Sequence, residues 1–182
     1  LVMGQYEGYL QEENIPIDSK TETYAALKLY IDNERWEGVP FFIRTGKKMD
    51  NSETQVVVQF KDVGDVPGNV LIIRIQPDEG VYFQFNAKKP GTEQELQQIS
   101  LDFCQSCILE NRINTPEAYE RLLDACFRGD RALFSQCDQI VVTWTFVNDL
   151  LAKYYKQGAP LYTYKQGSMG PEKANEFVDW IR

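Results

Sequence analysis

The stretch Glu34–Lys47, which reads E-R-W-E-G-V-P-F-F-I-R-T-G-K, organises this sequence. Its apolar run Val39–Ile43 is rich in strand-forming side chains and starts at a proline, which the first residue of a strand tolerates. Three cations, Arg44, Lys47 and Lys48, follow around the flexible Gly46. Basic groups at the end of a strand can hold an anionic or hydroxylated ligand, or they can simply keep the strand end in water. The residues of this stretch leave both interpretations open.

Alternation of apolar and polar residues predicts further strands on both sides of this stretch. The predicted strands cover residues 23–31, 39–45, 54–60, 70–76, 81–88 and 96–103. The Gly/Pro-rich segment 61–69 reads as a loop, and Pro77–Gly80 reads as a hairpin turn. Residues 1–20 show no clean periodicity and read as an entry segment. On strands 70–76 and 81–88 we expect the more apolar set of side chains, such as Ile73 and Val81, to lie under helices. Ile72 and Tyr82 would then lie on the other face, which a two-fold homodimer interface could use.

The periodicity becomes helical after residue 114. Thr115-Pro116-Glu117 gives a helix start with Gly129 as its stop, and Asp138 can cap a longer helix to about Gln157. A last helix would carry Ala174, Phe177, Val178 and Ile181. Strands followed by helices predict an α+β domain, with a mainly antiparallel β-sheet and helices packed on one face.

Composition narrows the classes of function. The 182 residues include 19 basic and 27 acidic side chains, for a net charge of −8, so the overall field does not favour nucleic acid. No apolar stretch reaches the length of a membrane span, and the first residues do not resemble a signal peptide. The start at Leu1 suggests a piece of a longer protein.

The four cysteines raise the question of metal or redox chemistry. Cys104 and Cys107 form a C-x-x-C, but Cys126 and Cys137 are eleven residues apart and the chain has no histidine. A structural zinc site usually draws on a second close pair or on histidines. We therefore expect no metal ligands, and we predict four reduced thiols in a cytoplasmic protein.

Six motifs carry a resemblance to a known family, and they occur in the family's order. The first is the opening stretch itself. The others are I-R-I-Q-P-D-E-G (Ile73–Gly80), A-K-K-P-G (Ala87–Gly91), P-E-A-Y-E-R-L-L-D (Pro116–Asp124), R-G-D-x-x-L-F (Arg128–Phe134) and Y-K-x-G-S-x-G-P-E (Tyr164–Glu172). Together they resemble the C-terminal domain of glucose-6-phosphate dehydrogenase, of the bacterial type.

The resemblance implies that Lys47 contacts the substrate, whereas other positions depart from the family's binding residues. Lys47 matches the lysine with which the family holds glucose 6-phosphate. A second basic contact commonly lies five positions later, where this chain has Ser52, so Lys48 or another lysine would have to replace it. Animal members bind a second, structural NADP in this domain. Arg44 and Arg74 match two of its basic positions, but Glu53 and Val57 replace two others, so we expect no binding there.

The resemblance also implies what this stretch of chain does not supply. A dinucleotide cradle is usually a glycine-rich turn between a strand and a helix, and the family's proton acceptor is a histidine. This sequence contains neither, so we expect no catalytic and no cofactor-binding residues within 1–182. The resemblance implies that this chain is the C-terminal substrate-binding and dimerisation domain, which is inactive alone. The complete enzyme would also contain an N-terminal NADP-binding Rossmann domain, which is absent from this chain.

The complete enzyme implied by the resemblance oxidises glucose 6-phosphate with NADP in the pentose phosphate pathway. It is cytoplasmic and forms a homodimer through the sheet. One alternative of another class stays open, a non-catalytic oligomerisation module without ligand contact. The reason for this alternative is that several strands carry apolar side chains on both faces. Helices can cover one face, and the other would need a partner.

Overall fold

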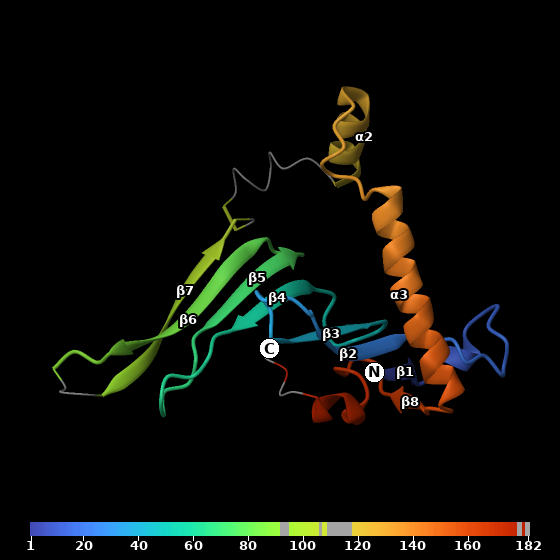
Figure 1. The fold of residues 1–182 in the computed structure, drawn as a ribbon, viewed down its shortest axis with the longest axis horizontal. Helices are drawn as coiled ribbons and strands as arrows, with labels where there is room; N and C mark the ends of the chain where they lie inside the picture. The colour runs from blue at the N-terminus through green and yellow to red at the C-terminus, as the bar shows by residue number, and fades with distance from the viewer. Residues whose placement is uncertain (92–94, 106, 109–117, 178–179, 181–182) are drawn as a thin grey trace. The chain divides into compact units, whose positions relative to one another are not determined.

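The computed structural model describes residues 1–91, 95–105, 107–108, 118–177 and 180. The chain forms two units, and each contains a four-stranded sheet (Figure 1). The first unit comprises Leu1–Asn51 and Phe134–Arg182, and the second comprises Ser52–Leu133. The predicted α+β class with mainly antiparallel pairing is confirmed, but the strands divide between two sheets where a single one was expected.

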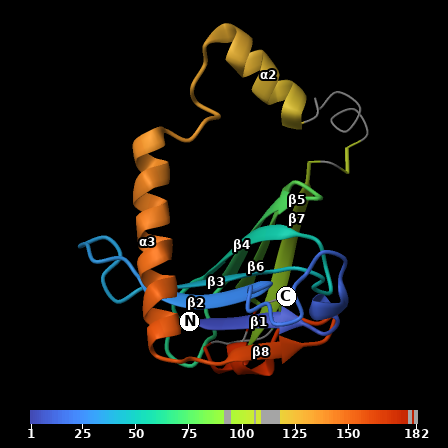
Figure 2. The same cartoon turned by 90° about the vertical axis from the view of Figure 1, so that its right-hand side faces the viewer.

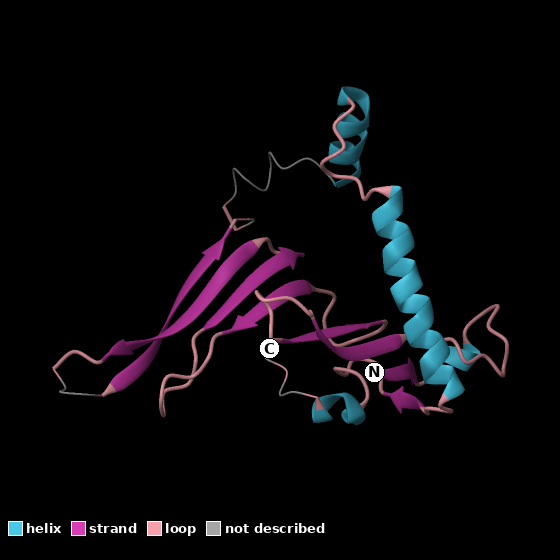
Figure 3. Ribbon diagram, viewed as in Figure 1, coloured by secondary structure: helices cyan, strands magenta, loops and turns pink. Residues whose placement is uncertain are grey.

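The sheet of the first unit has the strand order β3-β2-β1-β8 (Figure 3). Its strands are β1 (Val2–Tyr6), β2 (Tyr24–Tyr30), β3 (Pro40–Gly46) and β8 (Leu161–Tyr164). β1 pairs antiparallel with β2 and β2 with β3, whereas β1 and β8 run parallel, with Met3 opposite Leu161. The prediction of an entry segment was wrong for residues 2–6, and β8 was not predicted. β1 is buried at four of its five positions, so its side chains do not alternate in polarity.

The core of the first unit lies where β1, β2 and β8 meet. Its buried residues are Val2, Tyr6, Tyr24, Ala26, Tyr164 and Ala174. This unit also contains two short 3₁₀ helices, η1 (Tyr9–Gln11) and η2 (Glu172–Glu176). η2 replaces the predicted last helix and buries Ala174, while Val178 and Ile181 lie outside the described residues.

Helix α3 (Cys137–Lys156) makes its buried contacts at its C-terminal end. There Tyr154 is buried, and its hydroxyl donates a hydrogen bond to the Pro160 carbonyl at 2.6 Å. The first half of the helix is exposed (Figure 2). The predicted Asp138 cap is wrong by two residues, because Gln136 is the N-cap and forms a capping box with Gln139.

Over its described residues, the second unit contains an antiparallel sheet and one helix. Its strands follow in sequence order and run β4 (Thr54–Gln59), β5 (Val70–Gln76), β6 (Gly80–Lys88) and β7 (Leu96–Cys104). All four lie within one residue of the predicted bounds. Helix α2 (Ala118–Arg128) ends at Gly129, which has φ +69° as predicted for a helix stop. The predicted helix start at residues 115–117 lies outside the described residues.

One face of the second sheet is apolar and exposed, contrary to the expectation that helices cover it. Register places Ile73 beside Val56 and Val81, and Val81 beside Phe103, so these side chains share a face. Ile73 is 39% exposed and Phe103 54%, while Ile72 on the opposite face is buried. We call this surface the apolar face, and it comprises Val56, Val58, Ile73, Val81, Ile99, Leu101 and Phe103.

Within the part of the chain that the structure describes, neither α2 nor α3 is long and apolar enough to cross a membrane.

Candidate functional site

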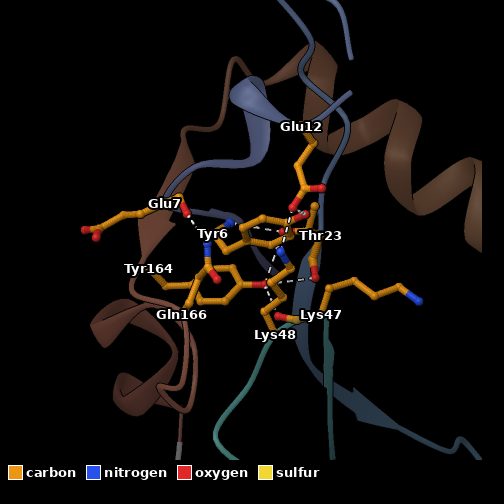
Figure 4. A network of polar contacts seen from close by, with 8 residues as sticks. All are labelled: Tyr6, Glu7, Glu12, Thr23, Lys47, Lys48, Tyr164 and Gln166. Carbon is orange, nitrogen blue, oxygen red and sulfur yellow. Dashed lines mark hydrogen bonds and ion pairs between the residues drawn. The ribbon is translucent and has the colours of Figure 1, made fainter. Parts of the chain in front are cut away.

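Lys47 lies immediately after the last residue of β3, at the edge of the first sheet. Its side chain is exposed and points away from the neighbouring polar groups (Figure 4). Among the described residues, none makes a hydrogen bond or an ion pair with its ammonium. The residue that the family resemblance singled out is therefore an exposed cation with no partner among the described residues.

The backbone around Lys47 is fixed on two sides. The Lys47 N–H donates to the Thr23 carbonyl at 2.8 Å, and the Lys47 carbonyl accepts from the Tyr164 hydroxyl at 2.7 Å. The next carbonyl, that of Lys48, accepts from the Gly167 N–H at 2.8 Å. The segment that follows β3 is thus held by the end of β8 and the loop after it.

Lys48, the neighbour of Lys47, forms an ion pair within the first unit. Its ammonium donates to Glu12 at 2.6 Å and lies 5.0 Å from the centre of the Tyr6 ring. The Tyr6 hydroxyl donates to the same Glu12 oxygen at 3.0 Å. The Lys48 ammonium is thus already paired, and its role in place of a basic residue at Ser52 stays a prediction.

The ion pair also sets the pH range in which it stabilises the fold. The hydrogen bond from Lys48 lowers the pKa of Glu12, and the same bond raises the pKa of Lys48. A lowered carboxyl pKa means that the folded state binds the proton less tightly than the unfolded state does. The stabilisation is thus complete between the pKa values of an unfolded glutamate and an unfolded lysine. It is lost as the pH falls through the lowered pKa of folded Glu12, or rises through the raised pKa of folded Lys48.

Two glycines from distant motifs pack against one buried tyrosine. Tyr24 is 2% exposed, and a Cβ atom on Gly46 would lie 2.8 Å from its ring. A Cβ on Gly170 would lie 2.2 Å from the same ring, and Gly170 has φ +100°. The G-K motif and the G-S-x-G-P motif therefore meet at Tyr24, beside the backbone that carries Lys47.

The two arginines that match a second dinucleotide site lie in different units and have partners of their own. Arg44 in β3 places its guanidinium 4.6 Å from the centre of the Trp180 ring. Arg74 in β5 forms an ion pair with Asp102 and donates to the Phe103 carbonyl at 3.3 Å. The expectation that no dinucleotide binds through these arginines stays a prediction. Ser52, the other doubtful position, is exposed at the start of the second unit.

The cysteines differ from the prediction of four reduced thiols. Cys104 and Cys107 form a disulfide, with Cα atoms 5.2 Å apart, within the usual range for such bonds. Cys126 and Cys137 are free and exposed. Over the described residues, no three cysteine, aspartate or glutamate side chains gather as a metal site would require.

Sequence reasoning did not identify the residues that hold Lys47 and Lys48 in place. These are Tyr6, Glu12, Thr23 and Tyr164 (Figure 4). The sequence contained one signal, because Tyr164 is the first residue of the last family-like motif. Its role depends on contacts with residues more than a hundred positions away.

Comparisons with known proteins agree on one family. Residues 1–180 match the family model described as glucose-6-phosphate dehydrogenase, C-terminal domain. The chain is 42% identical over 179 residues to glucose-6-phosphate 1-dehydrogenase of Bacillus subtilis, covering 93% of this chain and 36% of the relative. The enzyme of Aggregatibacter actinomycetemcomitans is 41% identical, with 98% of this chain and 39% of the relative covered. The chain thus spans little more than a third of the length of these relatives.

Solved structures give the same result. A glucose-6-phosphate dehydrogenase in complex with its substrate glucose 6-phosphate has a TM-score of 0.86 and 35% identity, covering all of this chain and 41% of that one. The glucose-6-phosphate 1-dehydrogenase of Mycobacterium avium has a TM-score of 0.82 and 34% identity, covering all of this chain and 40% of that one.

Proposed function

Because this chain belongs to the glucose-6-phosphate dehydrogenase C-terminal domain family, we propose that it is the substrate-side domain of an enzyme that oxidises glucose 6-phosphate with NADP. The observation that carries the proposal is Lys47, an unpartnered and exposed cation on a fixed backbone among the described residues, at the position of the family's substrate lysine. The product would be 6-phosphogluconolactone, formed in the pentose phosphate pathway of the cytoplasm.

Lys47 suits a phosphorylated sugar for physical reasons. An ammonium on a flexible stem donates up to three hydrogen bonds and attracts an anion at the same time. The chain carries a net charge of −8, so a local cation rather than the overall field must attract the anion. Lys48 supplies no second free charge, because Glu12 holds it.

Hydride transfer requires groups that this chain does not supply. The 182 residues include no histidine and no glycine-rich turn between a strand and a helix. A nicotinamide cofactor would supply the hydride acceptor, and we assign its cradle and the proton acceptor to an N-terminal domain of the complete enzyme. The role of residues 1–182 is to bind and orient the sugar phosphate.

A titration of the 182-residue chain with glucose 6-phosphate, followed by NMR, tests the substrate contact. We expect weak, saturable shifts of signals around Lys47, no shifts in a Lys47→Ala variant, and no NADP reduction by either protein. A Lys153→Ala variant, which removes an exposed lysine from α3, should respond as the wild type does. Shifts that persist without Lys47 would place the sugar phosphate elsewhere, and no shifts in any variant would favour the oligomerisation module.

The same domain is proposed to form the homodimer, and the apolar face supports this assignment. Seven aliphatic and aromatic side chains, each more than a third exposed, share one face of this antiparallel sheet. Soluble monomers rarely expose a contiguous apolar surface of this kind, and a sheet face can pair with its own copy about a two-fold axis. The interface would then use the Ile73 face, opposite to the Tyr82 face that the sequence suggested.

Replacing Ile73 with glutamate is expected to weaken self-association by at least about tenfold, because two-fold symmetry would bury two unpaired charges near the centre of the interface. Sedimentation over a concentration series measures the effect. A Gln98→Glu variant is the control, since it adds the same charge on the opposite face of β7 and keeps an acceptor for Gln84. A wild type that stays monomeric at high concentration would contradict the proposal.

A further inference from the structure

We propose that Tyr164 is a positioning residue for substrate binding, because its hydroxyl fixes the backbone carbonyl of Lys47 and thereby directs the Lys47 ammonium. The inference rests on the proposed role of Lys47. It adds a residue from β8, the opposite edge strand of the first sheet, to the site at the end of β3. β1 and β2 lie between these two strands.

The Tyr164 hydroxyl lies among three polar atoms in the interior of the unit. Tyr164 is 3% exposed. Its hydroxyl oxygen is 2.7 Å from the Lys47 carbonyl, 3.1 Å from the Thr23 carbonyl and 3.1 Å from the Thr23 hydroxyl (Figure 4). The ring packs against Tyr24 and Tyr6, with ring centres 5.4 and 6.3 Å away, so it has little freedom to turn.

The hydrogen bonds can be assigned a direction. A tyrosine hydroxyl has one proton and can also accept, and a carbonyl can only accept. The shortest contact therefore makes Tyr164 the donor to Lys47, and the Thr23 hydroxyl can donate to Tyr164. The Tyr6 N–H in turn donates to the Thr23 hydroxyl at 3.1 Å. This relay runs from Tyr6 in β1 through Thr23, just before β2, and Tyr164 in β8 to Lys47 after β3, and each member polarises the next.

Lys47 needs this support because of its place in the fold. It lies at the end of an edge strand, after Gly46, where the sheet itself no longer fixes the chain. Its own side chain has no partner among the residues that the structure describes. Only the backbone can set the direction of the side chain, and the Thr23 carbonyl and the Tyr164 hydroxyl hold the two sides of that backbone.

Tyr164 also keeps the proton that it must donate. Burial raises the pKa of its hydroxyl above the ordinary tyrosine value. The donor form is therefore present throughout the neutral range.

The test compares Tyr164→Phe with Tyr154→Phe in the intact dehydrogenase. Both tyrosines are buried in the first unit, and each donates one hydrogen bond to a backbone carbonyl, at 2.7 and 2.6 Å. Losing a neutral hydrogen bond of this kind corresponds to about a three- to tenfold change in an equilibrium constant, such as that for substrate binding. We expect Tyr164→Phe to raise KM for glucose 6-phosphate by about that factor with little change in kcat, and Tyr154→Phe to leave KM unchanged.

A second comparison shows whether Tyr164 acts through Lys47. In a Lys47→Ala background, Tyr164→Phe should cause no further loss of kcat/KM, since there is no ammonium left to direct. A full additional loss, or equal KM values for the two phenylalanine variants, would overturn the inference. Thr23→Val, which keeps the side-chain shape and removes the relay hydroxyl, should raise KM in the same direction and provides a readout if Tyr164→Phe does not fold.

The same experiment separates this inference from the proposed function. If Lys47→Ala lowers kcat/KM while Tyr164→Phe has no effect, only the positioning role is wrong. If Lys47→Ala itself has no effect, the substrate role of Lys47 is wrong as well.

Discussion

Replacing Lys47 with alanine in the intact enzyme is expected to lower kcat/KM for glucose 6-phosphate by about 30- to 900-fold. This factor corresponds to about 2–4 kcal/mol of transition-state stabilisation, the scale for losing a charged group that hydrogen-bonds the substrate. The effect should be this large because Lys48, the adjacent cation, is held by Glu12 at 2.6 Å and cannot replace the lost charge. Steady-state kinetics over a range of substrate concentrations measures it.

Lys48→Ala is the matched control for this prediction. It removes the same formal charge from the same loop, but from an ammonium that is already paired. If the two lysines contributed only to the long-range electrostatic attraction of the substrate, both variants would lose the same amount of activity. We expect a much smaller loss for Lys48→Ala, and equal losses would contradict a direct contact between Lys47 and the substrate.

Gly170→Ala is expected to destabilise the protein by about 3–5 kcal/mol in free energy of unfolding. Two costs add, because φ +100° is strained for any residue with a Cβ, and the new methyl group would lie 2.2 Å from the Tyr24 ring. Tyr24 is 2% exposed, so its ring has no room to move. Chemical denaturation of the variant and the wild type measures the difference.

Gly167→Ala separates the two costs. Gly167 lies in the same loop with φ +74°, and a Cβ there would meet no atom within 4 Å. Only backbone strain remains, so we expect a loss of about 1–2 kcal/mol. Equal destabilisation by the two variants would show that the contact with Tyr24 does not limit position 170.

The buried ring of Tyr24 also makes stability depend on alkaline pH. Burial raises its pKa to about 12, and among the described residues none accepts a hydrogen bond from its hydroxyl. Between the ordinary tyrosine pKa and this value, the unfolded state has lost the proton and the folded state has kept it. The free energy of unfolding therefore falls as pH rises through this window.

Local patterns predicted most of the secondary structure. The four strands of the second unit and both β2 and β3 alternate in polarity or are bounded by Gly and Pro, so each strand could be identified from its own residues. β1 could not, because it is buried at four of its five positions and does not alternate, and β8 could not, because it has only four residues. A parallel pairing between residues 3–6 and 161–164 leaves no local signal in either segment.

For the candidate site, too, the sequence predicted some residues, and other contacts were found only in the structure. The family-like motif R-T-G-K identified Lys47, and the sequence also contained Ser52, Lys48 and the glycines. The sequence did not show that Glu12 holds Lys48, that Tyr164 holds the Lys47 carbonyl, or that Gly46 and Gly170 flank one ring. Each of these contacts joins residues separated by at least 22 positions.

The sequence by itself determined the family, the strand-rich fold class and the identity of the cation, because these depend on residue types and on their local spacing. Only the tertiary structure decided which of two adjacent lysines has a free ammonium, which face of the second sheet is exposed, and that the C-x-x-C forms a disulfide. Side-chain partners and burial depend on the packing of distant segments, since a hydrogen bond or an apolar contact requires proximity in space and not along the chain.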